Sequence, residues 1–244
     1  MKHFQTAVVV GASSGIGADL VRQLAATGCR VVAIARRQDR LLALVNDYPQ
    51  QVIAWPIDIT TGEDVNQQIA QMAAALGGLD LFIYNAGIMP RVGKDDYPTE
   101  DDLATVDVNF SAAIRWINGA ALRFSATGAG TIVGVSSVAG DRGRRGGPVY
   151  AATKAGLNVY LEALRNRLTV KGVSVVTIKP GPIETAMTAG LGALPLMIPS
   201  NIAAKQILMH AGKGTSVAYV PGVWKFIMWI VRAVPQAIFQ RLDF

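Results

Sequence analysis

The stretch VVVGASSGIGADLVRQLAATG, residues 8–28, is the part of this chain that decides its fold. It reads as the end of a buried strand, then a turn that holds Gly11, Gly15 and Gly17, then an amphipathic helix. Glycine permits a tight turn, a close approach of the backbone to a phosphate, and close packing of the helix on the strand. The helix N-terminus beyond the turn favours negative charge. This order predicts a βα unit that binds a dinucleotide.

Apolar, β-branched runs alternate with segments of helical periodicity along the rest of the chain. Strands are predicted at residues 6–10, 30–35, 51–57, 79–84, 130–135, 173–178 and 216–220. Helices are predicted at residues 16–27, 39–47, 62–76, 99–126 with a break, 150–170 and 200–211. Strands that are apolar on both faces, each followed by a helix, indicate a parallel sheet covered on both sides. We therefore expect an α/β fold of the Rossmann type, a doubly wound parallel sheet of about seven strands with helices on both faces.

Composition limits the function classes. The chain has 244 residues, of which 51% are hydrophobic and 16% charged, which excludes a disordered or fibrous protein. The net charge of +6 is spread along the chain, so we expect no nucleic-acid partner. Cys29 is the only cysteine, and His3 and His210 are the only histidines. Neither an intrachain disulfide nor a metal site is expected, and a reducing, cytoplasmic setting fits best.

No internal repeat or polar linker divides the sequence. Residues 1–244 are therefore interpreted as a single dinucleotide-binding domain that includes the active site, with an apolar helical extension at residues 221–244. Residues 1–5 pass directly into the first predicted strand, so no signal peptide is expected.

The end of the second predicted strand bears on the choice of cofactor. Where a site for NAD would place an acidic side chain against the ribose 2′-hydroxyl, the chain has Ala35, Arg36 and Arg37. An arginine there accommodates a 2′-phosphate, so the sequence favours NADP(H) over NAD(H). The alternative is that both arginines are ordinary solvated charges that open a helix.

The ends of the third and fourth predicted strands complete this side of the expected cofactor site. Asp58 and Ile59 are positioned to meet the adenine ring, although Asp58 could equally be a helix cap. Small residues follow the fourth strand and would let a cofactor approach. The contacts predicted so far are Gly11, Ser13, Ser14, Gly15, Ile16, Gly17, Arg36, Arg37, Asp58, Ile59, Asn85, Ala86 and Gly87.

A second motif lies in SSVAGDRGRRGGPVYAATK, residues 136–154. If a helix begins near Tyr150, then Lys154 lies on the same face, four residues along. A phenol has a pKa near ~10, and a neighbouring ammonium is expected to lower it toward the range of a useful acid–base catalyst. A tyrosine and a lysine at this spacing are also a common surface pair.

Taken together, these motifs resemble the single-domain branch of the short-chain dehydrogenase/reductases. The resemblance runs from about residue 5 to residue 219. It rests on GASSGIG at 11–17, NAG at 85–87, Asn109, Ser137, Tyr150 with Lys154, and the Pro-Gly pair at 180–181. The chain departs from the usual pattern at Val10, Tyr84 and Thr153, where the family has Thr, Asn and Ser.

The resemblance assigns roles to four catalytic candidates. Tyr150 would exchange a proton with the substrate oxygen while the nicotinamide carries the hydride. Lys154 would lower the pKa of that tyrosine and hold the nicotinamide ribose. Ser137 would hydrogen-bond the carbonyl oxygen, and Asn109 would hold a water that links Lys154 to solvent. The further cofactor contacts that it implies are Tyr150, Lys154, Pro180, Gly181, Ile183 and Thr185. It also implies a homodimer or homotetramer.

Three loops, at residues 88–98, 141–149 and 188–199, are expected to border the substrate. The third is apolar and glycine-rich, like a mobile lid, which favours an apolar ketone, aldehyde or secondary alcohol. An alternative substrate is a 3-oxoacyl thioester on an anionic carrier, steered by Arg142, Arg144 and Arg145. The rival from another class is a non-catalytic NADP(H)-binding sensor or scaffold.

The last stretch contains a predicted helix of about 13 residues between Pro221 and Pro235. Lys225 and Arg232 interrupt it, so it is too short and too charged to span a bilayer. One interpretation is packing against the core or a subunit partner. The other is peripheral membrane contact through residues 223–242.

Overall fold

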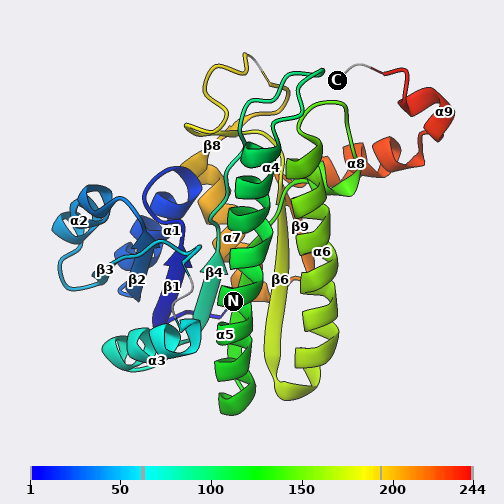
Figure 1. Ribbon diagram of the computed structural model, residues 1–244. Coiled ribbons are helices and arrows are strands. Elements are labelled where there is room, and N and C mark those ends of the chain that lie inside the picture. Colours follow the sequence, from blue (N-terminus) through cyan, green and yellow to red (C-terminus); the bar gives the residue numbers. More distant parts are fainter. Residues whose placement is uncertain (1, 62–63, 193, 243–244) are drawn as a thin grey trace.

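Seven parallel strands run through the middle of the protein in the order β3-β2-β1-β4-β5-β6-β9 (Figure 1). The computed structural model describes residues 2–61, 64–192 and 194–242. The strands are β1 Thr6–Val10, β2 Arg30–Ala35, β3 Val52–Pro56, β4 Leu81–Tyr84, β5 Gly130–Val135, β6 Val173–Pro180 and β9 Val217–Val220. The strand order reverses between β1 and β4, and ligands of such sheets bind beyond the carboxyl ends of the strands at that point. The predicted Rossmann-type fold is confirmed.

Helices cover both faces of the sheet, as predicted (Figure 1). Their bounds are α1 Gly15–Ala26, α2 Gln38–Asp47, α3 Val65–Leu76, α4 Thr99–Val106, α5 Ala112–Thr127, α6 Pro148–Leu168 and α7 Ser200–Lys213. On one face α1, α2 and α7 bury their apolar sides; on the other, α3, α5 and α6 do so. The first two residues of the predicted helix 62–76 lie outside the described residues.

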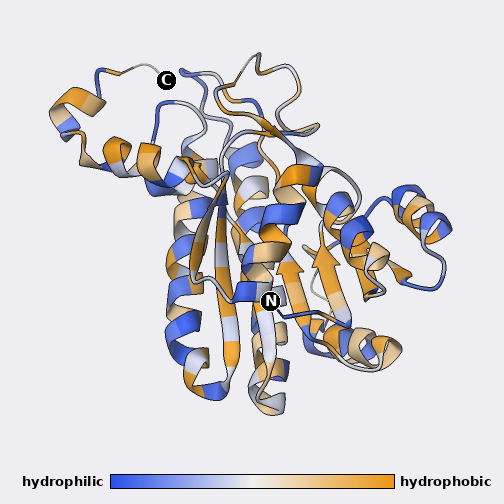
Figure 2. Ribbon diagram, turned by 180° about the vertical axis from the view of Figure 1, so that it is seen from behind, coloured by the Kyte–Doolittle hydropathy of each residue, from blue (hydrophilic) through white to orange (hydrophobic). Residues whose placement is uncertain are grey.

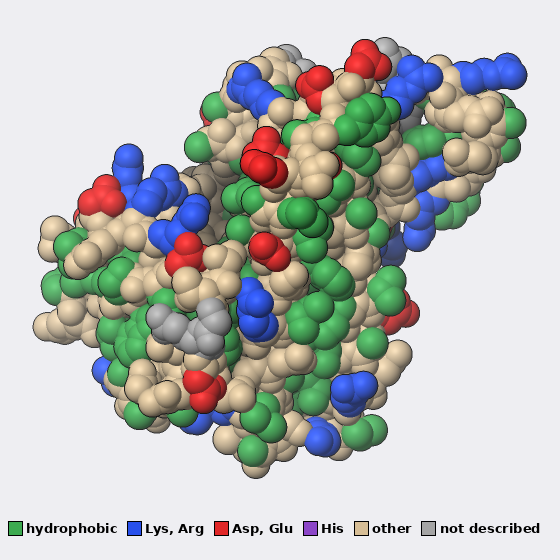
Figure 3. Space-filling view, viewed as in Figure 1, with side chains coloured by type: hydrophobic (Ala, Val, Ile, Leu, Met, Phe, Trp, Pro, Cys, Tyr) green, Lys and Arg blue, Asp and Glu red, His purple; other side chains and the backbone are tan. Residues whose placement is uncertain are grey.

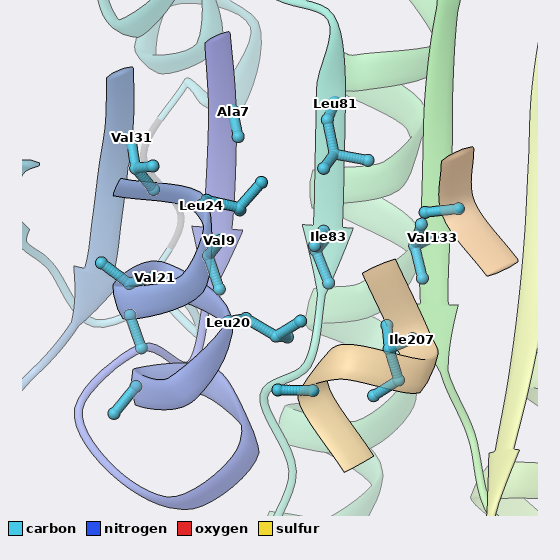
Figure 4. Close-up of a cluster of buried hydrophobic side chains, with 14 of the residues drawn as sticks. Ala7, Val9, Leu20, Val21, Leu24, Val31, Leu81, Ile83, Val133 and Ile207 are labelled. Carbon is cyan, nitrogen blue, oxygen red and sulfur yellow. The ribbon is translucent and has the colours of Figure 1, made fainter. Parts of the chain in front are cut away.

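The first strand shows how one sequence serves both faces. All five residues of β1 are buried. Side chains alternate across a strand, so Ala7 and Val9 join the core beneath α1 and α7, whereas Val8 and Val10 join the core that α3, α5 and α6 cover. Figure 4 shows the first of these cores, with Leu20 of α1 and Ile207 of α7 reaching toward the strands. An uninterrupted valine run is therefore what a doubly covered strand requires.

The break predicted within residues 99–126 is a π-helical segment, Asp107–Ser111, between α4 and α5. Its hydrogen bonding is wider than in an α-helix, because the backbone N–H of Ala112 donates to the carbonyl of Asp107, five residues back. Asn109 lies in this segment and is fully buried. The irregular turn thus carries one of the predicted catalytic residues.

Two features were not predicted. A short parallel pair, β7 Ile183–Glu184 with β8 Ile198–Pro199, closes the base of the third substrate loop. The other is a short helix, α9 Gln236–Phe239, which follows Pro235. The helix predicted between Pro221 and Pro235 is confirmed as α8 Trp224–Ala233. Among the described residues, no helix has the length and apolar content needed to cross a membrane.

Candidate active site

The glycine turn between β1 and α1 is fixed by close backbone contacts. Gly11 has φ of +84°, and a Cβ there would lie 2.7 Å from the Cα of Ala86. A Cβ on the buried Gly17 would collide with the carbonyl oxygen of Gly11. The side-chain amide of Asn85 donates to that same oxygen at 3.2 Å. The turn and the 85–87 segment therefore form one tightly packed floor, with room for no side chain between them.

Arg37 reaches across this turn. Its Nη2 donates to the hydroxyl oxygens of Ser13 and Ser14, both at 2.8 Å. Arg36 instead extends toward Asp58, with 3.8 Å between Nη1 and Oδ2, and both side chains are substantially exposed. Of the two guanidinium groups at the end of β2, that of Arg37 contacts the glycine turn and that of Arg36 faces the loop after β3.

The loop after β3 holds Asp58 in a local turn. Its Oδ1 accepts from the backbone N–H and the hydroxyl of Thr60, at 2.9 and 2.7 Å. These bonds, with help from Arg36, hold the pKa of the Asp58 carboxyl below its usual range. The interpretation of Asp58 as a helix cap is wrong, since Asp64 caps α3 by accepting from the N–H groups of Asn66 and Gln67. The side chain of Ile59 is buried in the core.

Lys154 and Asn109 meet at Gly87, just beyond β4. A Cβ on Gly87 would lie 3.3 Å from Asn109 Oδ1 and 3.4 Å from Lys154 Nζ. Asn109 is held by a reciprocal pair with Ile88, accepting from its N–H at 2.8 Å and donating to its carbonyl at 2.9 Å. Lys154 Nζ donates to the carbonyl of Val135 at 3.1 Å. The sequence places these two residues 45 positions apart, and the fold brings them together.

Burial governs the charge of Lys154. Its side chain lies in the protein interior, and loss of solvation lowers its pKa to about 8. With a pKa of about 8, the group titrates well below the range of an exposed lysine.

Tyr150, in the first turn of α6, lies beside Ser137, which follows β5. A hydrogen bond to the Ser137 side chain favours the phenolate, but burial outweighs it and raises the pKa of Tyr150 above its usual value. The expectation that Lys154 lowers this pKa is not met. The ammonium lies 5.7 Å from the centre of the phenol ring, and the groups that oppose the effect of burial are Ser137 and Arg144.

The segment after β6 closes the other side of the site. A Cβ on Gly15 would lie 2.9 Å from the Thr185 methyl group, so this segment touches the glycine turn. Ile183 is buried and Pro180 ends β6. The indole of Trp224 packs directly on Gly181, where a Cβ would collide with the ring. All the predicted segments therefore converge at the carboxyl edge of the sheet.

Two sets of contacts made by the loop that follows Ser137 were not predicted from the sequence. Asp141, at the end of the short 3₁₀ turn Val138–Asp141, accepts from Lys179 at 2.5 Å and from the Tyr219 hydroxyl at 2.6 Å. These bonds tie the loop that follows Ser137 to β6 and β9. Their partners lie 38 and 78 residues away, and no local pattern signals them.

Arg142 makes the second set. Its Nη1 donates to the carbonyls of Val231 and Val234, both at 2.6 Å, at the C-terminal end of α8. Its guanidinium also lies 3.7 Å from the ring centre of Phe239. Arg142 therefore satisfies the free carbonyls of a helix end and anchors the C-terminal helices.

Tyr84 has a use that the sequence did not reveal. Its side chain is fully buried, and its hydroxyl donates to the carbonyl of Val108 at 2.6 Å. Val108 precedes Asn109 within the π-helical segment. The departure from the family pattern at this position thus braces the turn that carries Asn109.

Comparisons with known proteins agree with this geometry. The family model of the short-chain dehydrogenases matches residues 5–194. The chain is 33% identical over 238 residues to an uncharacterized oxidoreductase of Mycobacterium tuberculosis, covering 93% of this chain and 94% of the relative. It is 30% identical over 202 residues to an uncharacterized oxidoreductase of Staphylococcus haemolyticus, covering 82% and 87%.

Solved structures agree as well. A short-chain dehydrogenase/reductase from Mycobacterium ulcerans superposes with a TM-score of 0.82 at 25% identity, covering 90% of both chains. A short-chain dehydrogenase from Sphingobium yanoikuyae, solved in complex with NADPH, gives 0.81 at 25% identity, covering 96% and 98%. Fold and site together define an oxidoreductase of the Rossmann class. The chain belongs to the short-chain dehydrogenase/reductase family.

Proposed function

We propose that this protein is an NADP(H)-dependent oxidoreductase that interconverts an apolar ketone or aldehyde and the corresponding alcohol. The observation that carries the proposal is the convergence of Ser137, Tyr150, Lys154 and Asn109 at the carboxyl edge of the sheet, beside the glycine turn. When bound, the nicotinamide cofactor supplies or accepts the hydride.

The chain's own residues would handle the proton. Tyr150 donates it to the substrate oxygen during reduction and takes it back during oxidation, while the Ser137 hydroxyl orients that oxygen. A raised pKa keeps the Tyr150 phenol protonated at neutral pH, which suits the direction of reduction. Lys154 has a pKa of about 8 and lies next to Asn109, so it can pass a proton onward from the buried site.

Preference for NADP(H) is supported by the two arginines at the end of β2. A guanidinium matches a phosphate in a bidentate way. Arg37 already lies over Ser13 and Ser14, and Arg36 is largely exposed beside it. An apolar substrate is supported by the predicted substrate loop at 188–199, where Leu191 and Leu196 are exposed.

Catalysis is tested by following NADPH absorbance against a panel of ketones and aldehydes. Tyr150→Phe removes the proposed acid, and we expect the rate to fall by about a hundredfold or more. Tyr160→Phe is the matched control, because it removes a phenol from the same helix that bonds only to Asn118 on the surface. Full activity in Tyr150→Phe would reject this mechanism, and NADPH binding without turnover of any carbonyl would favour the sensor or scaffold.

Cofactor choice is tested by titrating NADPH and NADH separately. Arg37→Ala and Arg36→Ala should each weaken NADPH binding by about tenfold or more while changing NADH binding little. Arg40→Ala, on the exposed side of α2, is the control. Equal losses for both cofactors would show that these side chains do not read the 2′-phosphate.

A further inference from the structure

The C-terminal arm, residues 221–242, extends from the body of the protein near the carboxyl edge of the sheet (Figure 1). It contains α8 and α9, and Figure 2 shows it to be largely hydrophobic. Large apolar side chains on it face solvent, including Phe226 at 63% exposed, Trp229 at 61% and Ile238 at 54%. Phe226 and Trp229 stack on each other, with 6.0 Å between ring centres. An exposed apolar cluster of this kind marks a binding surface.

Helix α8 has two apolar faces with different surroundings. Met228 is buried and Trp224 packs on Gly181, so one face is attached to the protein. Phe226, Trp229 and Ile230 recur at three- and four-residue spacing and share another face, which is open to solvent. The exposed face is therefore not required for folding of the arm onto the body.

Charge indicates what covers this face. No Asp or Glu occurs between residues 185 and 242, a span that contains Lys205, Lys213, Lys225, Arg232 and Arg241. In α8, Lys225 and Arg232 are seven residues apart and flank the exposed aromatic side chains. Figure 3 shows several Lys and Arg side chains at the upper right, in the region of the arm. Aromatic residues between basic flanks are typical of helices that lie in a membrane interface.

We propose that the C-terminal arm binds the surface of a membrane that contains anionic lipid. Phe226, Trp229 and Ile230 enter the boundary between headgroups and acyl chains, and Lys225 and Arg232 meet lipid phosphates. A second copy of this chain fits less well. A symmetric contact sets the same patch against itself, which would bring these cations toward their own copies with no acidic residue of the arm to offset them.

Hydrogen bonds from the 141–149 loop fix the arm to the body of the protein, so the arm can set the orientation of the protein on a membrane. Arg142 donates to two carbonyls at the end of α8, and Arg145 donates to the carbonyl of Gln240 at 3.0 Å. The predicted substrate loop at 188–199, with Leu191 and Leu196 exposed, lies at the same end of the molecule (Figure 1). Binding through the arm therefore turns the substrate side of the protein toward the lipid.

Vesicle flotation tests the proposal directly. The full chain is mixed with vesicles of phosphatidylcholine, alone or with phosphatidylglycerol, and we expect flotation chiefly with the anionic mixture. Trp229→Gln should reduce binding by about tenfold. Leu122→Gln is the matched control, because Leu122 on α5 is equally exposed at 61% and should be neutral. Failure of the unaltered protein to float with anionic vesicles overturns the proposal.

Charge is tested in the same assay. Lys225→Gln and Arg232→Gln should each weaken binding about fivefold, and added salt should weaken the unaltered protein likewise. Unchanged binding in both variants would overturn the electrostatic part of the proposal.

Fluorescence identifies the inserted residue and separates the lipid from a second copy. Tryptophan emission should shift to shorter wavelength with anionic vesicles, and Trp229→Phe should lose most of the shift while still floating. Light scattering without vesicles should give the same mass for the unaltered protein and Trp229→Gln. A halved mass in the variant would assign the arm to a subunit contact and overturn the proposal.

Discussion

The glycine turn and the C-terminal arm lie at opposite sides of the same site, and they are held in place in different ways. In the turn, backbone packs on backbone, so Gly11 and Gly17 admit no added atom. In the arm, Arg142 reaches carbonyls 89 and 92 residues away. The first kind of constraint is local and sterically rigid. The position of the arm depends on a few side chains, so substitutions there can loosen the arm without altering the sheet.

The largest effect is expected at the turn. Gly17→Ala sets a methyl group against the Gly11 carbonyl oxygen, which should lower the free energy of unfolding by about 3 kcal/mol or more and abolish cofactor binding. Gly143→Ala, where the added carbon meets nothing, should change stability by less than ~0.5 kcal/mol. Urea unfolding of both variants measures the contrast, and a tolerated Gly17→Ala would show that the turn is softer than its packing indicates.

Lys154, between the two regions, should give the next largest effect. Its pKa falls from 10.5 to about 8 on folding, so between pH 8 and 10 the unfolded chain binds more protons than the folded one. The free energy of unfolding should therefore rise with pH across this window, by about 2 kcal/mol relative to Lys154→Met. Urea unfolding of both proteins at several pH values measures the difference. A pH-independent difference would mean that burial does not perturb this ammonium.

A smaller and more local effect is expected at the arm. Arg142→Met removes charge-assisted hydrogen bonds and should reduce the local stability of α8 and α9 by about 1.5 kcal/mol, while global unfolding changes little. Hydrogen exchange of α8 amides measures this, with Arg144→Met, an exposed neighbour, as control. Equal protection in all three proteins would show that the apolar contacts alone hold the arm.

The smallest effect is expected at Tyr84. Tyr84→Phe keeps the buried ring and removes the donor to the Val108 carbonyl, which should cost about 1 kcal/mol. Tyr97→Phe, on a highly exposed tyrosine, should cost almost nothing. Thermal unfolding compares the pair, and equal midpoints would remove Tyr84 as a brace of the Asn109 segment.

The sequence was most informative where spacing alone fixes geometry. Three of the predicted strands, including β1, have the bounds that the structure shows, because valine runs between polar turns leave little choice. The spacing of Gly11, Gly15 and Gly17 likewise predicted the turn between β1 and α1. Tyr150 and Lys154 were related by helical spacing, and α6 begins at Pro148, close to the predicted start.

Other features depend on contacts between distant residues, which spacing does not encode. Nothing local pairs Asp141 with Lys179 or Arg142 with the end of α8. The pKa of Tyr150 was misjudged for a related reason: helical spacing predicts that an ammonium lies nearby, but the burial that outweighs it comes from the whole fold. The NADP(H) preference and the subunit count stay predictions.

The π-helical segment that carries Asn109 amounts to one extra residue inserted into an otherwise regular helix. Each residue turns an α-helix by about 100°, so α4 and α5 are out of phase by that amount across the segment. Deleting one residue between 107 and 111 would bring the two helices into phase and rotate everything before the deletion relative to everything after it. The direction of the Asn109 side chain therefore depends on the extra residue in this segment. The number of residues between α4 and α5 matters for the site as much as the identity of Asn109 does.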